Sequence, residues 1–199
     1  MNLSCCLFSR SVNMAKEWDV LNALRHYRHD WLNHMQLING YIAMGRTEKV
    51  ETLIDDIVNQ AKNESHLSNL NMNQLAEEIL TFNWNGHSFS LNFEVISESK
   101  DWSNWEELLL SFFREFMKIL DLSTKYGEEQ QAVLMMNDIE SITVEIDFQG
   151  SLRINKEWIE NIKRIERRYG NHIDQIEWNE SECYVKFVAD IEDEHITMT

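Results

Sequence analysis

Residues 24–38 have the sequence LRHYRHDWLNHMQLI, and their apolar side chains recur with the period of an α-helix. A helix advances about 100° per residue. If Trp31 marks the centre of an apolar stripe, His29 lies about 160° from it, on the opposite face. The other stripe residues, within roughly 40° of Trp31, are Leu24, Tyr27, Met35, Ile38 and Ile42. The sequence therefore predicts an amphipathic helix that holds the His29 imidazole in the open, where another protein can reach it.

A helical hairpin is predicted around this stretch. The first helix is expected over residues 15–44 and the second over 48–67, with Gly45 at the C′ position and Thr47 as the N-cap. So short a connection makes an antiparallel pair. A lone hairpin leaves most of its stripe exposed, so we expect a second copy of the chain to complete a four-helix bundle across a two-fold axis. The alternative is that the hairpin packs on its own C-terminal domain.

From about residue 71 the pattern changes to alternating helices and strands. Ser103-Asn104-Trp105-Glu106 matches a capping box and is expected to open a helix that ends near Gly127. Further helices are predicted over residues 73–84 and 155–169, and strands over 88–96, 132–136, 142–148, 173–178 and 183–189. We expect an α+β fold with helices on one face of a largely antiparallel sheet. The predicted organisation is a tail (1–14), a helical hairpin (15–70) and an α/β sandwich domain (71–199).

Composition limits the compartment and the partners. The 199 residues carry a formal charge of −16, which argues against nucleic acid and anionic membranes as partners. Residues 15–46 have four basic and three acidic side chains, whereas residues 47–199 carry −18. The first helix therefore accepts an acidic partner that the rest of the chain repels. Three cysteines, without a membrane-spanning run or a signal-peptide core, predict a cytoplasmic protein.

Five strings carry a resemblance to a known family. They are Arg28-His29-Asp30-Trp31, Gln36-Leu37-Ile38, Glu64-Ser65, Leu67-Ser68-Asn69-Leu70 and Leu80-Thr81-Phe82-Asn83-Trp84. They resemble the dimerisation and phosphoacceptor module of two-component signalling proteins, and more closely the sporulation initiation phosphotransferase B family of spore-forming bacilli. The resemblance covers most of the chain from about residue 20. It implies a homodimer whose C-terminal domain is built like a degenerate kinase ATP-binding domain.

The resemblance also implies an activity. Members of that family take a phosphoryl group from the aspartate of one response regulator onto their own histidine and pass it to the aspartate of a second regulator, without using ATP. By residue match, His29 would be the phosphorylated residue. The chain itself would hold no cofactor, and a divalent metal would belong to the partner regulator.

Side chains on the same helix suggest how the ring would be assisted. Arg25 and Arg28 would offset phosphoryl charge, and Asn33 and Gln36 would donate hydrogen bonds on the same face. Asp30, about 100° round the helix, would either orient the ring or form only a surface ion pair.

The glycine spacing argues against a kinase. The six glycines are Gly40, Gly45, Gly86, Gly127, Gly150 and Gly170, and no two lie within four residues of each other. The sequence therefore has no G-x-G turn, and it has no P-loop motif. A histidine kinase of this build holds ATP with such turns. Two alternatives stay open: a degenerate kinase with residual nucleotide binding, and a non-catalytic dimeric scaffold that sequesters regulators.

Other candidate residues are assigned structural roles. His34 lies roughly 140° from His29, so one metal ion cannot bind both of them together with His26. Cys183 is expected to be a small buried apolar side chain. Six methionines are expected to fill the core: Met35, Met44, Met72, Met117, Met135 and Met136. The basic residues between 156 and 168 are expected to form a solvated face, or else a docking site for an acidic partner.

Overall fold

The computed structural model describes residues 20–97, 101–125 and 129–189, in two compact units, 1–50 and 51–199. The first unit contains α1 (Val20–Ala43) and the turn into α2 (Thr47–Asn69). Gly45 has a φ of 68°, and its N–H donates to the carbonyl of Ile42 at 3.0 Å. The next N–H, of Arg46, donates to the carbonyl of Tyr41 at 2.9 Å. These two bonds are a Schellman motif, which explains why the predicted C′ residue is glycine.

The predicted helical hairpin is confirmed, with two differences in detail. Helix α2 begins at Thr47 itself, so the N-cap prediction is wrong by one residue. No residue of α1 is buried in the single chain. Trp31, the centre of the apolar stripe, is 47% exposed, and Leu24 and Ile42 are more than half exposed. The periodicity identified an apolar face correctly, but none of the residues that the structure describes buries it.

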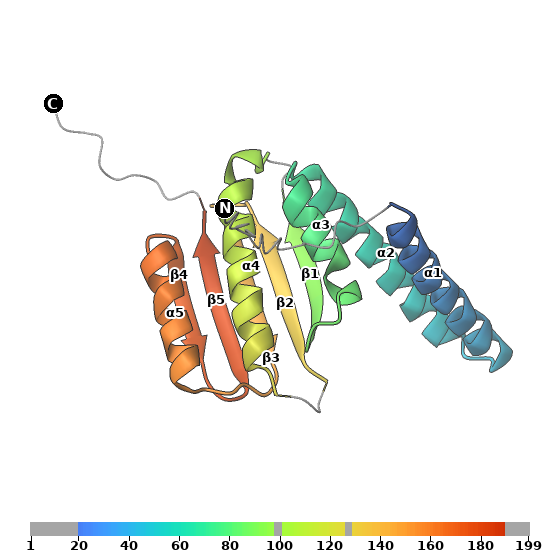
Figure 1. The fold of residues 1–199 in the computed structure, drawn as a ribbon. Helices are drawn as coiled ribbons and strands as arrows, with labels where there is room; N and C mark the ends of the chain where they lie inside the picture. The colour runs from blue at the N-terminus through green and yellow to red at the C-terminus, as the bar shows by residue number, and fades with distance from the viewer. Residues whose placement is uncertain (1–19, 98–100, 126–128, 190–199) are drawn as a thin grey trace, which may run out of the picture. The chain divides into compact units, whose positions relative to one another are not determined.

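The second unit is a five-stranded mixed sheet in the order β1-β2-β3-β5-β4. β1 pairs with β2 in parallel, and every other neighbouring pair is antiparallel. The long helices α4 and α5 lie side by side across one face of the sheet, as Figure 1 shows. The elements are α3 (Asn73–Thr81), η1 (Phe82–Trp84), β1 (Ser90–Ile96), η2 (Ser103–Trp105), α4 (Glu106–Ser123), β2 (Gln131–Asn137), β3 (Thr143–Gln149), α5 (Lys156–Tyr169), β4 (Ile173–Trp178) and β5 (Glu182–Val188).

The core lies between this sheet and its helices. Alternation along β3 sends Val144, Ile146 and Phe148 into the core and leaves Glu145 and Asp147 on the other, half-exposed face. Complete burial of a large apolar side chain contributes about 1.5–3 kcal/mol. The largest fully buried side chains come from helices, strands and connecting segments alike: Trp102, Trp158, Phe112, Phe116, Phe148 and Phe187.

Side chains rather than another strand cover much of the outer edge of β1. Asn83, within one of the family strings, accepts from the N–H of Leu91 and donates to its carbonyl, each at 2.8 Å. Further along, Asn63 Oδ1 accepts from the N–H of Val95 at 3.4 Å, and Nδ1 of His66 lies 3.2 Å from the Val95 carbonyl. These side chains satisfy backbone groups that an edge strand otherwise leaves open, and they attach the C-terminal part of α2 to the sheet.

The predicted capping box is wrong. Oε1 of Glu106 accepts from the N–H of Gln74 at 2.6 Å, so this carboxylate caps the start of α3 instead of its own helix. The N–H of Ser103 donates to Asp101 at 2.9 Å, and a short 3₁₀ turn leads into α4. The helix predicted over 73–84 likewise ends as a 3₁₀ turn from Phe82.

The other structural assignments hold in part. Cys183 is fully buried, as predicted. Of the methionines, Met72, Met117 and Met136 are buried, whereas Met44 is 58% exposed and does not fill a core.

Candidate functional site

His29 lies in the middle of α1, on its polar face. Its side chain is 72% exposed, so the ring is open to an incoming protein. The helix positions it rigidly, since the backbone of α1 is regular from Val20 to Ala43. An exposed imidazole on a regular helix suits a group that must be reached by a large partner.

Two polar side chains lie near one nitrogen of the ring. Oδ1 of Asp30 is 3.3 Å from Nδ1 of His29, and Nδ2 of Asn33 is also 3.3 Å from Nδ1. A carboxylate only accepts hydrogen bonds, so Asp30 favours the tautomer that carries its proton on Nδ1. An amide N–H of Asn33 favours the opposite tautomer, and the two contacts therefore compete. When Asp30 is engaged, Nε2 holds the free lone pair.

The remaining predicted residues are not brought to the ring. Arg25 donates to Asn22 Oδ1 at 3.0 Å. Arg28 and Gln36 are exposed, and among the residues that the structure describes neither makes a hydrogen bond or ion pair to His29. The geometry thus places Asp30 and Asn33 next to the imidazole and leaves the three longer side chains on the same helix in solvent or with other partners.

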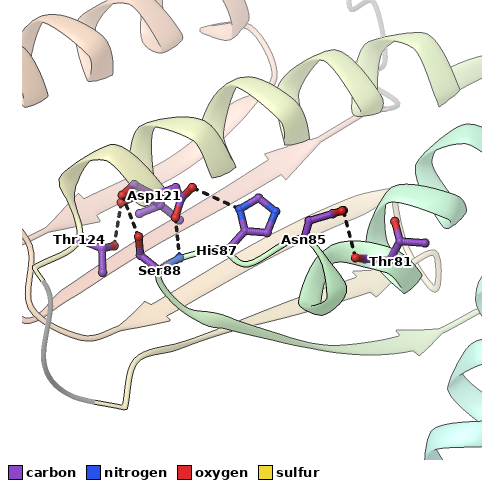
Figure 2. Close-up of polar contacts among 7 residues, drawn as sticks. Thr81, Asn85, His87, Ser88, Asp121 and Thr124 are labelled. Atoms are coloured by element: carbon purple, nitrogen blue, oxygen red, sulfur yellow. Dashed lines mark hydrogen bonds and ion pairs between the residues drawn. The ribbon is translucent and has the colours of Figure 1, made fainter. Parts of the chain in front are cut away.

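A second histidine–carboxylate pair lies in the C-terminal unit, and sequence reasoning missed it. Nδ1 of His87 is 3.2 Å from Oδ2 of Asp121, whose Oδ1 accepts from the N–H of Ser88 at 2.7 Å; Figure 2 shows the arrangement. The imidazole also stacks on the buried ring of Phe82, with centroids 3.8 Å apart. The only local hint was a carboxylate, Asp121, within an apolar run of α4.

The electrostatics of this pair follow from its contacts. Partial burial disfavours the charged form of Asp121, but hydrogen bonds from Ser88 and from His87 outweigh it, so the pKa of this carboxyl lies below its usual value. His87 borders an open cavity of about 790 Å³ at the edge of the sheet where β1 and β2 begin. The neighbouring walls are mostly neutral, with Ser88, Ser90 and Gln131 among them. The pair ties the loop before β1 to the end of α4.

The described part of the chain has neither a cluster of metal-ligating side chains nor a helix that could span a membrane. No group of three His, Cys, Asp or Glu side chains in these residues is placed to hold a metal ion. No helix in them is both long and apolar enough to cross a membrane.

Comparison with known proteins gives matches along almost the whole chain. Residues 12–70 match the family described as the α-helical domain of SpoOB-type sensor kinases, and residues 71–190 match the one described as the C-terminal domain of sporulation initiation phosphotransferase B. Sporulation initiation phosphotransferase B of Bacillus subtilis (strain 168) is 34% identical over 136 residues, which is 67% of this chain and 71% of that protein.

Among solved structures, the blue-light activated histidine kinase of Erythrobacter litoralis EL346 aligns with a TM-score of 0.40 and 10% identity. The alignment covers 88% of this chain and 61% of the kinase, so this chain spans less than two thirds of that protein.

Proposed function

Because the chain belongs to the sporulation initiation phosphotransferase B family, we propose that it is a phosphorelay phosphotransferase acting in the initiation of sporulation. It takes a phosphoryl group from the aspartate of one response regulator onto His29 and passes it to the aspartate of a second regulator, without ATP. The observation that carries the proposal is the exposure of the His29 ring, 72%, on a regular helix with a carboxylate at Nδ1.

The first step is a phosphoryl transfer from the regulator's aspartate to the His29 imidazole. The lone pair of Nε2 attacks the phosphorus of the regulator's acyl phosphate, the N–P bond forms, and the P–O bond to the aspartate breaks. The aspartate leaves as a carboxylate with that electron pair. The proton on Nδ1 stays on the ring, where the Asp30 carboxylate at 3.3 Å stabilises the positive charge that develops. The second step is the same reaction reversed onto another carboxylate.

Positioning and charge neutralisation dominate phosphoryl transfer, because the transition state is loose. In the proposed reaction a divalent metal on the regulator neutralises most of the phosphoryl charge. This chain contributes the nucleophile and, in solvent around it, the cations Arg25 and Arg28. The imidazole must be neutral to attack, because the lone pair of the unprotonated ring nitrogen is the nucleophile.

A homodimer is part of the proposal. The exposed apolar face of α1 includes Leu24, Tyr27 and Trp31, all between 47% and 55% exposed. On α2, Ile54 and Val58 are 45% and 44% exposed. Contiguous exposed apolar side chains of this kind mark an interaction surface. A second copy of the hairpin would bury them in a four-helix bundle, with the polar face that carries His29 outside.

Transfer from a labelled regulator tests the proposal. The chain is mixed with a response regulator phosphorylated on its aspartate, in the absence of nucleotide. We expect label on the chain that is stable to alkali, lost in acid, and absent from the His29→Gln variant. Label on His29→Gln would refute the site. Labelling from ATP alone would favour a residual kinase, and regulator binding without labelling would favour a scaffold.

A further inference from the structure

The outer face of α5 carries cations that this acidic protein does not neutralise. Lys163, Arg164 and Arg167 are exposed, and none of them has a carboxylate within 4.0 Å among the described residues. Other cations of the same unit do have such partners: Arg114 pairs with Glu78, Arg168 with Glu115, and Lys186 with Asp174. Lys62 and Lys118 are also exposed and without such a partner, but they lie on separate helices. Helix α5 instead carries three such cations within five residues, in a segment, 47–199, that carries −18.

The face has a shape as well as a charge. A shallow hollow of about 450 Å³ is lined by Glu160, Lys163, Glu166 and Arg167. Nε of Arg167 donates to the carbonyl of Lys163 at 3.1 Å, which fixes the guanidinium against the helix. One turn before Lys163, Ile159 is 41% exposed. The opposite side of α5 is anchored in the core by Trp158, Ile162, Ile165 and Tyr169.

Stabilisation of the helix alone does not account for this face. Cations in the last turn, here Arg167 and Arg168, interact favourably with the helix dipole. Lys163 lies before the last turn, so the helix dipole does not favour a cation there. Lys156 lies in the first turn, where the dipole makes positive charge unfavourable. It also gives no reason for an exposed isoleucine, Ile159, on the same stripe.

We propose that the stripe formed by Ile159, Lys163 and Arg167 docks an acidic polypeptide segment of a partner protein. Lys163 and Arg167 lie one helical turn apart, about 6 Å along the axis, so the segment presents two carboxylates at that spacing beside an apolar side chain that covers Ile159. The acidic remainder of the unit repels such a partner everywhere else, so the stripe also selects its orientation.

The carboxylates within the hollow set the specificity. Glu160 and Glu166 line the same hollow as the two cations, so they repel a continuous polyanion such as nucleic acid. A polypeptide places its charges singly and avoids them. The proposal does not depend on phosphoryl transfer, and its test involves no phosphate.

Binding of a synthetic peptide to the full chain tests the proposal by fluorescence anisotropy. The probe is a helical peptide with two glutamates one turn apart beside a leucine, and a scrambled peptide of equal composition is the reference. We expect specific binding that weakens by at least about tenfold in Lys163→Glu/Arg167→Glu. A probe with lysines in place of the glutamates should restore binding to that variant.

The matched control is Lys62→Glu/Lys118→Glu, which makes the same change of net charge at exposed positions outside α5. It should bind the probe as the parent protein does. Equal affinity for the scrambled peptide, equal losses in both double variants, or tighter binding of duplex DNA would overturn the proposal. So would binding that occurs only after residues 190–199 are removed, because the surface would then belong to the chain's own acidic end.

Discussion

Oδ1 of Asp30 lies 3.3 Å from Nδ1 of His29, its neighbour in sequence on α1. A carboxylate at Nδ1 favours the tautomer with its proton there, against the competing amide of Asn33, and in the proposed transfer this leaves Nε2 as the nucleophile. Both residues lie on the same regular helix, so their contact does not depend on any other part of the fold.

This pair predicts the effect of Asp30→Asn. The amide has no negative charge to stabilise the developing imidazolium, so we expect transfer to His29 to slow by about tenfold, the equivalent of one charge-assisted hydrogen bond. Rapid-quench transfer from a phosphorylated regulator measures the rate. Asp56→Asn, an exposed carboxylate on α2, is the control. A rate unchanged by Asp30→Asn would show that the contact is only a surface ion pair.

The exposed stripe of α1 predicts a change of assembly. Trp31→Asp places a charge at the centre of the proposed dimer contact, and we expect a monomer by sedimentation at concentrations where the parent chain is a dimer. Leu122→Asp changes a leucine that is 59% exposed on α4, and it should leave the dimer intact. Dissociation by both variants, or by neither, would contradict the assignment of the contact to α1.

The Asp121 carboxyl predicts a pH dependence of stability. Its pKa is lower in the folded chain than in the unfolded one, so its contribution is complete at neutral pH and is lost as the pH falls below about 4. We expect Asp121→Asn to lower the free energy of unfolding at pH 7 by about 1–2 kcal/mol. The difference from the parent chain should vanish in acid. Urea unfolding at several pH values measures it, and a gap that persists at low pH would contradict the ionic origin.

The thiol of Cys183 is expected to be unreactive in the folded chain. Burial raises its pKa to about 12, and the side chain is fully buried, so a Cys5→Ser/Cys6→Ser chain should not react with iodoacetamide at pH 8 until it unfolds. The same chain in urea is the positive control. Rapid alkylation of the folded double variant would show that β5 opens readily.

How far the sequence predicts this fold depends on how local each interaction is. The alternation of Val144, Ile146 and Phe148, and the glycine at position 45, are settled by a few neighbouring residues, and both are confirmed. The cap formed by Glu106 lies 32 residues from Gln74. Ser103 and Glu106 also fit a capping box within one helix. The sequence therefore could not show that Glu106 caps the distant helix α3 instead of its own.

The same limit applies to the candidate site. Exposure of His29 follows from the period of one helix, whereas the contact between His87 and Asp121 joins residues 34 apart, and no local pattern announces it. The period of the same helix also predicts the apolar stripe around Trp31, but it does not say what covers the stripe, and Trp31 is 47% exposed in the described part of the chain. In the proposed homodimer, the second copy of the hairpin would cover this stripe.

The proposed relay depends on one imidazole, His29, which carries the phosphoryl group between two regulators. The most direct measurement is the reconstituted relay, with one phosphorylated regulator, this chain in catalytic amount, a second regulator and no nucleotide. We predict that His29→Gln abolishes phosphorylation of the second regulator, while His34→Gln, on the same helix, transfers at the parent rate. Transfer through His29→Gln at a rate near that of the parent chain would show that His29 is not the phosphoryl carrier.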